Sequence, residues 1–307
     1  MTLRSLLLGS VTILFITTAG AQTRPMHTRD VTRLSQLQIS EYLKKKDVIF
    51  VAVGATESQG GMPSDREYIA PLGSAAQMAE EADAVYMPNL AYFYPGSTIT
   101  SSATVYVSIP LGEAYLKAIA HSLLRQGFKT QIWVWHGHGP APLYVGAMVR
   151  DFFEETHVPI LSIDGAAAER AYKGEKDKIT YAKYAMVGHL EDIPLANEVP
   201  ARTAGRGGAG AEDPGLGILT KMGLAGSLAL GYWWADPEAH SAGMGGAKLP
   251  STAEEREAWA KIGKQQLAAI VKTMDLKNVI AGLQQHVKFT EDNIVPKFKS
   301  MLPESQK

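Results

Sequence analysis

Apolar runs without polar alternation recur along the chain, and stretches with helical periodicity separate them. Three of these runs, at residues 49–53, 129–137 and 158–164, are rich in apolar and β-branched side chains and end at glycine or polar residues. This pattern is typical of parallel strands buried on both faces. The apolar piece at 85–93 is followed by a Ser/Thr-rich segment at 97–108 that also has strand character.

Amphipathic helices are predicted between these strands. The spacing of apolar residues places helices at 34–46, around 74–84, at 112–127, 141–156 and 251–274. In the last of these, Ser251 and Glu254 are placed as a capping box. The alternation of strands and helices predicts an α/β fold, a three-layer α/β/α sandwich with a mostly parallel central sheet. No linker or internal repeat divides residues 22–307, so we expect a single domain, with a glycine-rich loop at 203–217.

The first 21 residues have the layout of a secretory signal peptide. Arg4 is followed by an apolar core, residues 6–16, and by the small residues Ala19, Gly20 and Ala21, which predict cleavage before Gln22. The apolar core is shorter than the roughly 20 residues that a spanning helix needs. We therefore expect a secreted or periplasmic protein that has no membrane segment after cleavage.

Composition narrows the chemistry further. The 307 residues are 46% hydrophobic and 20% charged, enough for one large core, and the formal net charge of −1 gives no field that would attract nucleic acid. A small molecule is the expected partner. The chain has no cysteine, so any metal would be held by His, Asp and Glu side chains.

Two strands end in polar turns flanked by glycine. Glu57 follows the strand at 49–53, and His138 follows the strand at 129–137. If the strands are neighbours, both side chains lie at the same sheet edge, where open α/β sheets bind their ligands. A carboxylate and an imidazole suit Zn²⁺ or Mn²⁺. Asp65 and Glu67 follow on the loop that Glu57 begins, and His189 is a further ligand or proton carrier.

Four motifs, in order along the chain, resemble the creatininase family of metal-dependent amidohydrolases. They read GATESQGGMPSDRE from Gly54, YPGSTITSSATVYVS from Tyr94, HGHGPA from His136 and GYWWADPEAHSAG from Gly231. The resemblance implies the same α/β fold and hydrolysis of a non-peptide or cyclic C–N bond in a small molecule. Family members assemble as hexamers or related oligomers, so it also implies a homo-oligomer.

The resemblance implies a ligand set and a proton carrier. One metal would be held by Glu57, His138 and an acidic residue, which is Glu67 if one residue is missing from the loop and Asp65 otherwise. His189 would correspond to the family's catalytic histidine and would pass a proton to the leaving nitrogen. Ligands of the family's second metal are replaced by Gln59, a poor Zn²⁺ ligand, and by Pro140, which offers none. We therefore expect one divalent ion, or a degenerate site for two.

Other interpretations of these residues stay open. Glu57 could pair with an arginine, His138 could be a structural histidine, and His189, beside two acids, could form an exposed ion pair. His136 is expected to be structural or to support the ligands. A catalytically impaired binding protein on the same scaffold is the main alternative to an enzyme. A serine hydrolase is also possible in principle, but the sequence around Ser227 lacks the outer glycines of a nucleophile elbow.

Overall fold

The structure is a computed structural model that describes residues 24–199, 214–223 and 248–301. The predicted signal peptide, Ser227 and the GYWWADPEAHSAG motif lie outside these residues. No helix in the described ranges is long and apolar enough to cross a membrane.

The central sheet has four strands, all parallel. They are β1 (Val48–Ala52), β2 (Val85–Met87), β3 (Thr130–Trp135) and β4 (Leu161–Asp164), in the order β2-β1-β3-β4. β1 and β3 pair directly, with Ala52 opposite Val134. The strands that precede Glu57 and His138 are therefore neighbours, which meets the condition for both side chains to lie at one sheet edge.

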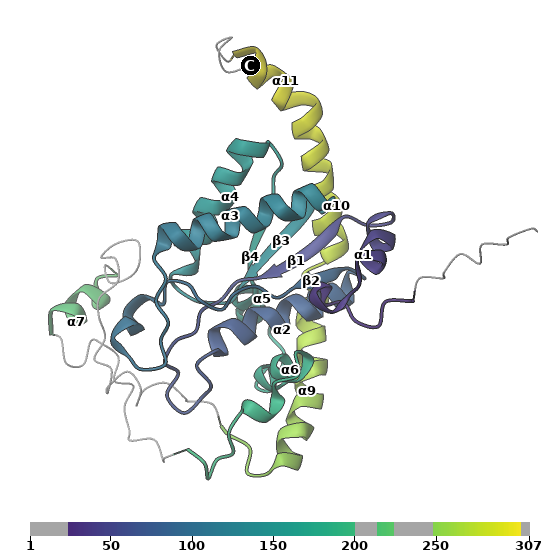
Figure 1. Cartoon of the computed structure of the whole chain (residues 1–307). Helices are drawn as coiled ribbons and strands as arrows, with labels where there is room; N and C mark the ends of the chain where they lie inside the picture. The colour runs from purple at the N-terminus through teal and green to yellow at the C-terminus, as the bar shows by residue number, and fades with distance from the viewer. Residues whose placement is uncertain (1–23, 200–213, 224–247, 302–307) are drawn as a thin grey trace, which may run out of the picture.

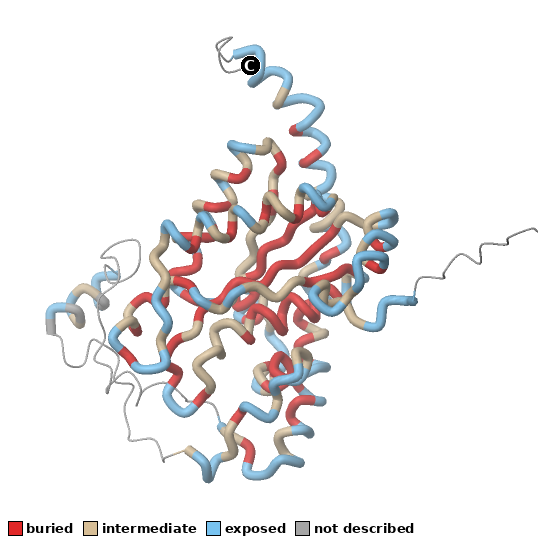
Figure 2. The backbone as a smooth tube through the Cα atoms, viewed as in Figure 1, coloured by how far each residue is buried: buried red, intermediate tan, exposed pale blue. Residues whose placement is uncertain are grey.

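Helices cover both faces of this sheet (Figure 1). Helices α3 (Ile109–Gln126) and α4 (Ala141–Thr156) pack on one face. Helix α2 (Arg66–Glu81) packs on the other, and α6 (Ile179–Met186) and α9 (Ala253–Lys272) pack against α2 on that side. Side chains of β1 alternate between the two cores: Ile49 and Val51 join the first, and Phe50 joins the second. Strand β1 is buried along its length (Figure 2). The predicted α/β/α sandwich is confirmed.

The remaining elements lie around these layers. They are η1 (Val31–Arg33), α1 (Gln36–Leu43), η2 (Gly96–Thr100), α5 (Gly165–Ala171), η3 (Leu190–Asp192), α7 (Pro214–Lys221), α10 (Leu276–Phe289), η4 (Thr290–Ile294) and α11 (Val295–Met301). Helix α10 runs through the π-helical turn η4 into α11, which projects from the body of the molecule (Figure 1).

Several expectations about single elements were wrong. The segment 97–108 is not a strand: it starts within η2 and then runs as a loop that bonds to the turn after β1, with Val105 N donating to Thr56 O at 3.1 Å. The cap of α9 is Thr252 rather than Ser251, because the Thr252 hydroxyl accepts from Glu255 N. The end of the predicted 203–217 loop belongs to α7.

Candidate active site

Glu57 and His138 meet at the carboxyl edge of the sheet. Val53 N donates to Val134 O at 2.9 Å, so the pairing of β1 with β3 continues beyond the strand ends toward both residues. The two side chains are almost fully buried, and His138 Nε2 lies 3.7 Å from Glu57 Oε1. Residues from separate parts of the sequence thus converge where a parallel sheet offers a ligand site.

Glu57 is a buried carboxyl group whose hydrogen bonds come from neutral side chains. Thr98 Oγ1 donates to its Oε2 at 2.6 Å and Gln59 Nε2 donates to its Oε1 at 3.2 Å. No lysine or arginine of the described ranges lies within ion-pair distance of it. Burial raises the pKa of Glu57 to about 8, the Thr98 hydrogen bond opposes this, and the charge of Glu67 adds to it. A cation at this place would stabilise the ionised form.

His138 is held as a neutral imidazole. Burial lowers its pKa to about 4, against a smaller opposing effect of the Pro95 backbone. Its Nδ1 lies 3.4 Å from the Tyr144 hydroxyl, whereas Nε2, the nitrogen nearer Glu57, has no hydrogen-bond partner among the described residues. Gln59 Oε1 is likewise buried and unpartnered there. Unpartnered buried polar atoms are costly, and an imidazole nitrogen beside a carboxylate suits a divalent ion.

Glu67 lies in the first turn of α2, not on a loop as expected. Helix α2 packs directly against the residue after β1: a Cβ atom added at Gly54 would stand only 2.2 Å from Glu67 O. Burial raises the pKa of the Glu67 carboxyl group, and Arg66, His136 and Lys183 act against this. The charge of Glu67 also raises the pKa of Glu57, so the Glu67 carboxylate interacts electrostatically both with Glu57 and with these basic groups.

Asp65 precedes α2 at the N-cap position, although its side chain makes no capping bond. Its Oδ1 is buried without a hydrogen-bond partner. Burial raises the pKa of Asp65, and the charge of His189 is the largest effect that opposes this. Asp65 thus interacts electrostatically with His189, whereas Glu67 interacts with Glu57.

His189 lies at the surface beside η3. Its ring is about half exposed, and Nδ1 lies 2.9 Å from Asp192 Oδ2. This is the exposed pair that the sequence offered as an alternative to catalysis.

The described residues contain no group of three His, Asp or Glu side chains already arranged to hold a metal ion. The buried pair Glu57–His138 fits a cation, with Glu67 and Asp65 as the nearby acids. A third ligand would have to move toward the pair. The assignment between Glu67 and Asp65 therefore stays a prediction.

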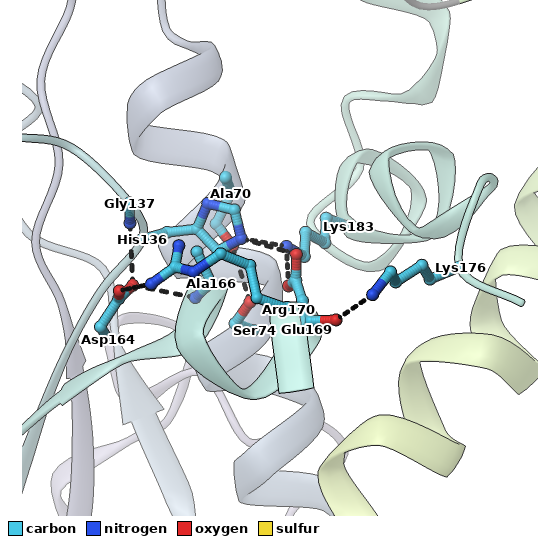
Figure 3. A network of polar contacts seen from close by, with 10 residues as sticks. All are labelled: Ala70, Ser74, His136, Gly137, Asp164, Ala166, Glu169, Arg170, Lys176 and Lys183. Carbon is cyan, nitrogen blue, oxygen red and sulfur yellow. Dashed lines mark hydrogen bonds and ion pairs between the residues drawn. The ribbon is translucent and has the colours of Figure 1, made fainter. Parts of the chain in front are cut away.

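A second buried polar group was missed by the sequence analysis (Figure 3). Lys183 of α6 donates to Glu169 Oε1 and lies 2.9 Å from His136 Nε2, which itself lies 2.9 Å from Glu169 Oε2. The expectation that His136 is a structural or supporting residue agrees with these contacts. The available signal was Lys183 itself, a single charge in the otherwise apolar stretch YAKYAM.

The loop that carries both histidines is fixed by Asp164 at the end of β4. Gly137 N donates to Asp164 Oδ1 at 2.9 Å, and Arg170 donates to Oδ2 at 2.8 Å. Gly137 has φ +60°, a left-handed conformation that glycine adopts without strain. This turn gives the two histidines different partners, Glu57 for His138 and the Glu169–Lys183 pair for His136.

Comparison with known proteins decides the family. The sequence profile of the creatininase family, described as creatinine amidohydrolase, matches residues 32–192, more than half of the chain. The chain belongs to the creatininase family. The matched range includes every candidate residue named above, from Glu57 to His189.

Solved structures of creatininase share the fold. A crystal structure of creatinine amidohydrolase (creatininase) is 17% identical, covers 81% of this chain and 98% of its own length, and has a TM-score of 0.51. A structure described as "Creatininase Mn" is 16% identical over 80% of this chain and 98% of its own length, with a TM-score of 0.50. No curated protein sequence gave a significant match. At these identities the structures support the fold, while the family match supports hydrolysis of amide-type C–N bonds at the level of the family.

Proposed function

We propose that the chain is an exported, metal-dependent amidohydrolase that cleaves a non-peptide or cyclic C–N bond of a small molecule. The observation that carries this proposal is the buried pair of Glu57 and His138, 3.7 Å apart, with His138 Nε2 unpartnered. Membership of a hydrolytic family supports the reaction class, and the manganese form of a structural neighbour supports a divalent ion.

Glu57 and His138 would hold the ion, with Glu67 or Asp65 as the third ligand. A bound Zn²⁺ or Mn²⁺ supplies Lewis acidity, lowering the pKa of a bound water from 15.7 toward about 7 and polarising a carbonyl oxygen. We propose one ion, because Gln59 already bonds to Glu57 and Pro140, at the start of α4, has no side-chain donor.

The chain's own groups prepare this site. Thr98 and Gln59 fix the Glu57 carboxyl group, and the contact with Tyr144 orients His138. Exclusion of water at this depth strengthens each electrostatic interaction. His189, in electrostatic reach of Asp65, is the proposed proton donor to the leaving nitrogen.

Metal stoichiometry tests the proposal. The mature protein, stripped with a chelator and dialysed against Zn²⁺ or Mn²⁺, is expected to retain one ion per chain by elemental mass spectrometry. His138→Ala should lose that ion and keep its circular dichroism spectrum. His121→Ala is the matched control, because His121 lies on α3 and pairs with Glu155 at the surface.

Two results would count against a metal enzyme. A wild-type protein that retains no ion, and hydrolyses no cyclic amide when either metal is added, would favour the binding-protein alternative. An ion retained equally by wild type and His138→Ala would place it elsewhere.

Export is proposed from the sequence of residues 1–21 alone. After expression in a Gram-negative host, the intact mass of the periplasmic protein should correspond to a chain that begins at Gln22. A protein that keeps Met1 and stays in the cytoplasm would contradict export.

A further inference from the structure

A pocket of about 240 Å³ opens beside Glu67, on the face of the sheet covered by α2 and α6. Its polar lining consists of Arg66, Glu67, His136, Glu169, Thr180 and Lys183, and Tyr184 adds its ring and hydroxyl group. The volume is below the usual range of roughly 300–1,000 Å³ for pockets that take drug-sized ligands. Only a small molecule, or one end of it, would fit.

Arg66 brings a positive charge that forms no direct ion pair to this pocket. Its side chain is partly buried at the start of α2, and it forms no hydrogen bond or ion pair with the residues that the structure describes. It is near enough to lower the pKa of Glu67, but the two do not form an ion pair. A guanidinium group offers paired N–H donors whose geometry matches a carboxylate.

Lys183 of α6 contributes a second donor to the lining of the pocket. The ammonium group is buried and has three N–H donors, of which Glu169 and His136 take at most two. Its stem is fixed because α6 packs on Gly73 of α2, where an added Cβ would stand 2.6 Å from Lys183 Cα. Lys183 therefore presents its remaining donor from a rigid position (Figure 3 shows its contacts).

Tyr184 places a buried hydroxyl group in the lining of the same pocket. The residue is 1% exposed, and its hydroxyl group is buried without a hydrogen-bond partner in the described ranges. Asp65 interacts with this hydroxyl, but without the geometry of a hydrogen bond. Buried hydroxyl groups are nearly always paired in folded proteins, so this hydroxyl has a donor to offer, either to Asp65, whose Oδ1 is also unpartnered, or to a ligand in the pocket.

The charges of the pocket favour an anion. Lys183 neutralises Glu169 through their direct contact. The charge of Arg66 is offset by the neighbouring Glu67, which is an acid of the proposed metal site. When Glu67 binds a cation, its negative charge no longer offsets that of Arg66. On this point the inference rests on the proposed function.

We propose that this pocket binds a carboxylate group of the substrate, with Arg66 as the main donor and with Lys183 and Tyr184 completing the contacts. The substrate class is then narrower than small amides in general. It is a small amide or cyclic amide that carries a separate carboxylate, held beside the bond that the Glu57–His138 site hydrolyses.

Acetate is the probe for this pocket, and acetamide is its neutral counterpart of nearly equal size. Ligand-observed NMR on the mature protein in the presence of Zn²⁺ should show saturable acetate binding and none for acetamide. Arg66→Gln should weaken acetate binding at least tenfold. Arg150→Gln, which removes an exposed arginine of α4, should leave it unchanged.

Lys183 requires a different design, because its removal alone leaves Glu169 buried and unpaired. The double variant Lys183→Met/Glu169→Gln removes both charges together. It should weaken acetate binding several-fold and keep the wild-type circular dichroism spectrum. Unchanged acetate affinity in this variant would remove Lys183 from the proposed site.

The outcomes separate this inference from the proposed function. Two results would overturn the carboxylate pocket: no acetate binding to wild type, or acetate binding that Arg66→Gln leaves unchanged. The second result would also be seen if acetate bound only to the metal ion. Arg66→Gln should still retain one ion per chain. A protein that binds acetate through Arg66 but no metal refutes the metal enzyme and keeps the pocket.

Discussion

Two glutamates of similar burial, Glu57 and Glu169, have opposite pKa shifts. Glu57 is 5% exposed and its pKa is raised to about 8, because burial dominates. Glu169 is 9% exposed, and burial acts in the same direction, but the His136 hydrogen bond and the charges of Lys183 and His136 outweigh it and bring the pKa to about 2. The difference is a cation, which Glu169 has and Glu57 lacks. This contrast is the physical reason to place an ion at Glu57.

The Glu169–Lys183 pair predicts a specific acid sensitivity. Because the folded pKa of Glu169 is lowered from 4.5 to about 2, its stabilising effect is present above pH 4.5 and is lost as the pH falls toward 2. Between pH 5 and pH 3, urea titration should show wild type losing about 2 kcal/mol more stability than Lys183→Met/Glu169→Gln.

The control for this comparison is Glu154→Gln, which changes an exposed glutamate of α4. It should follow the wild-type pH dependence. Parallel pH profiles for wild type and the double variant would show that Glu169 is not stabilised in its charged form.

At the scale of elements, the approach of α2 to β1 positions the site. A methyl group at Gly54 would stand 2.2 Å from Glu67 O and 2.5 Å from Tyr68 Cα. Both are backbone atoms, so a change of side-chain rotamer cannot relieve the clash. Gly54→Ala should therefore push α2 from the strand end, destabilise the fold by roughly 1–3 kcal/mol and weaken metal retention through displacement of Glu67.

Gly146→Ala is the matched substitution, because apart from its chain neighbours and the nearby backbone of α4 itself nothing lies within 4 Å of its Cβ position. Helix propensity predicts that it is neutral or stabilising by up to roughly 1 kcal/mol. Thermal unfolding and metal retention of both variants give the measurement. Equal stability of the two would mean that the packing of α2 on β1 is looser than the structure describes.

The start of α2 also shows where prediction from sequence failed. The periodic apolar pattern was assigned from Ser74, but the helix begins at Arg66 and contains Pro71. Proline commonly marks a helix boundary, and Asp65 offers no capping bond. The segment 97–108 failed for a related reason: its β-branched residues suit a strand, but its hydrogen bonds go to the turn after β1. Tertiary contacts, not local propensity, decide both segments.

For the whole molecule, hydrophobic pattern was enough for the architecture. Apolar runs such as 49–53 have no polar face, and this predicts a parallel sheet with helices on both sides. In the structure, the adjacency of β1 and β3 brings Glu57 close to His138. The group of His136, Glu169 and Lys183 could not be predicted, because these residues come from the turn after β3, from α5 and from α6 and meet only through packing. The third metal ligand depends on side-chain positions that no spacing rule determines.

The central claim is that Glu57 and His138 share one divalent ion. A crystal of the mature protein soaked in Zn²⁺ or Mn²⁺, with anomalous scattering recorded at the metal edge, tests it most directly. We expect one anomalous peak per chain, bonded to His138 Nε2 at about 2.0–2.2 Å and to a Glu57 oxygen, with Glu67 or Asp65 completing the site and His189 within reach of an ion-bound water. Anomalous peaks only elsewhere, with Glu57 and His138 still in direct contact and without an ion, would contradict the account.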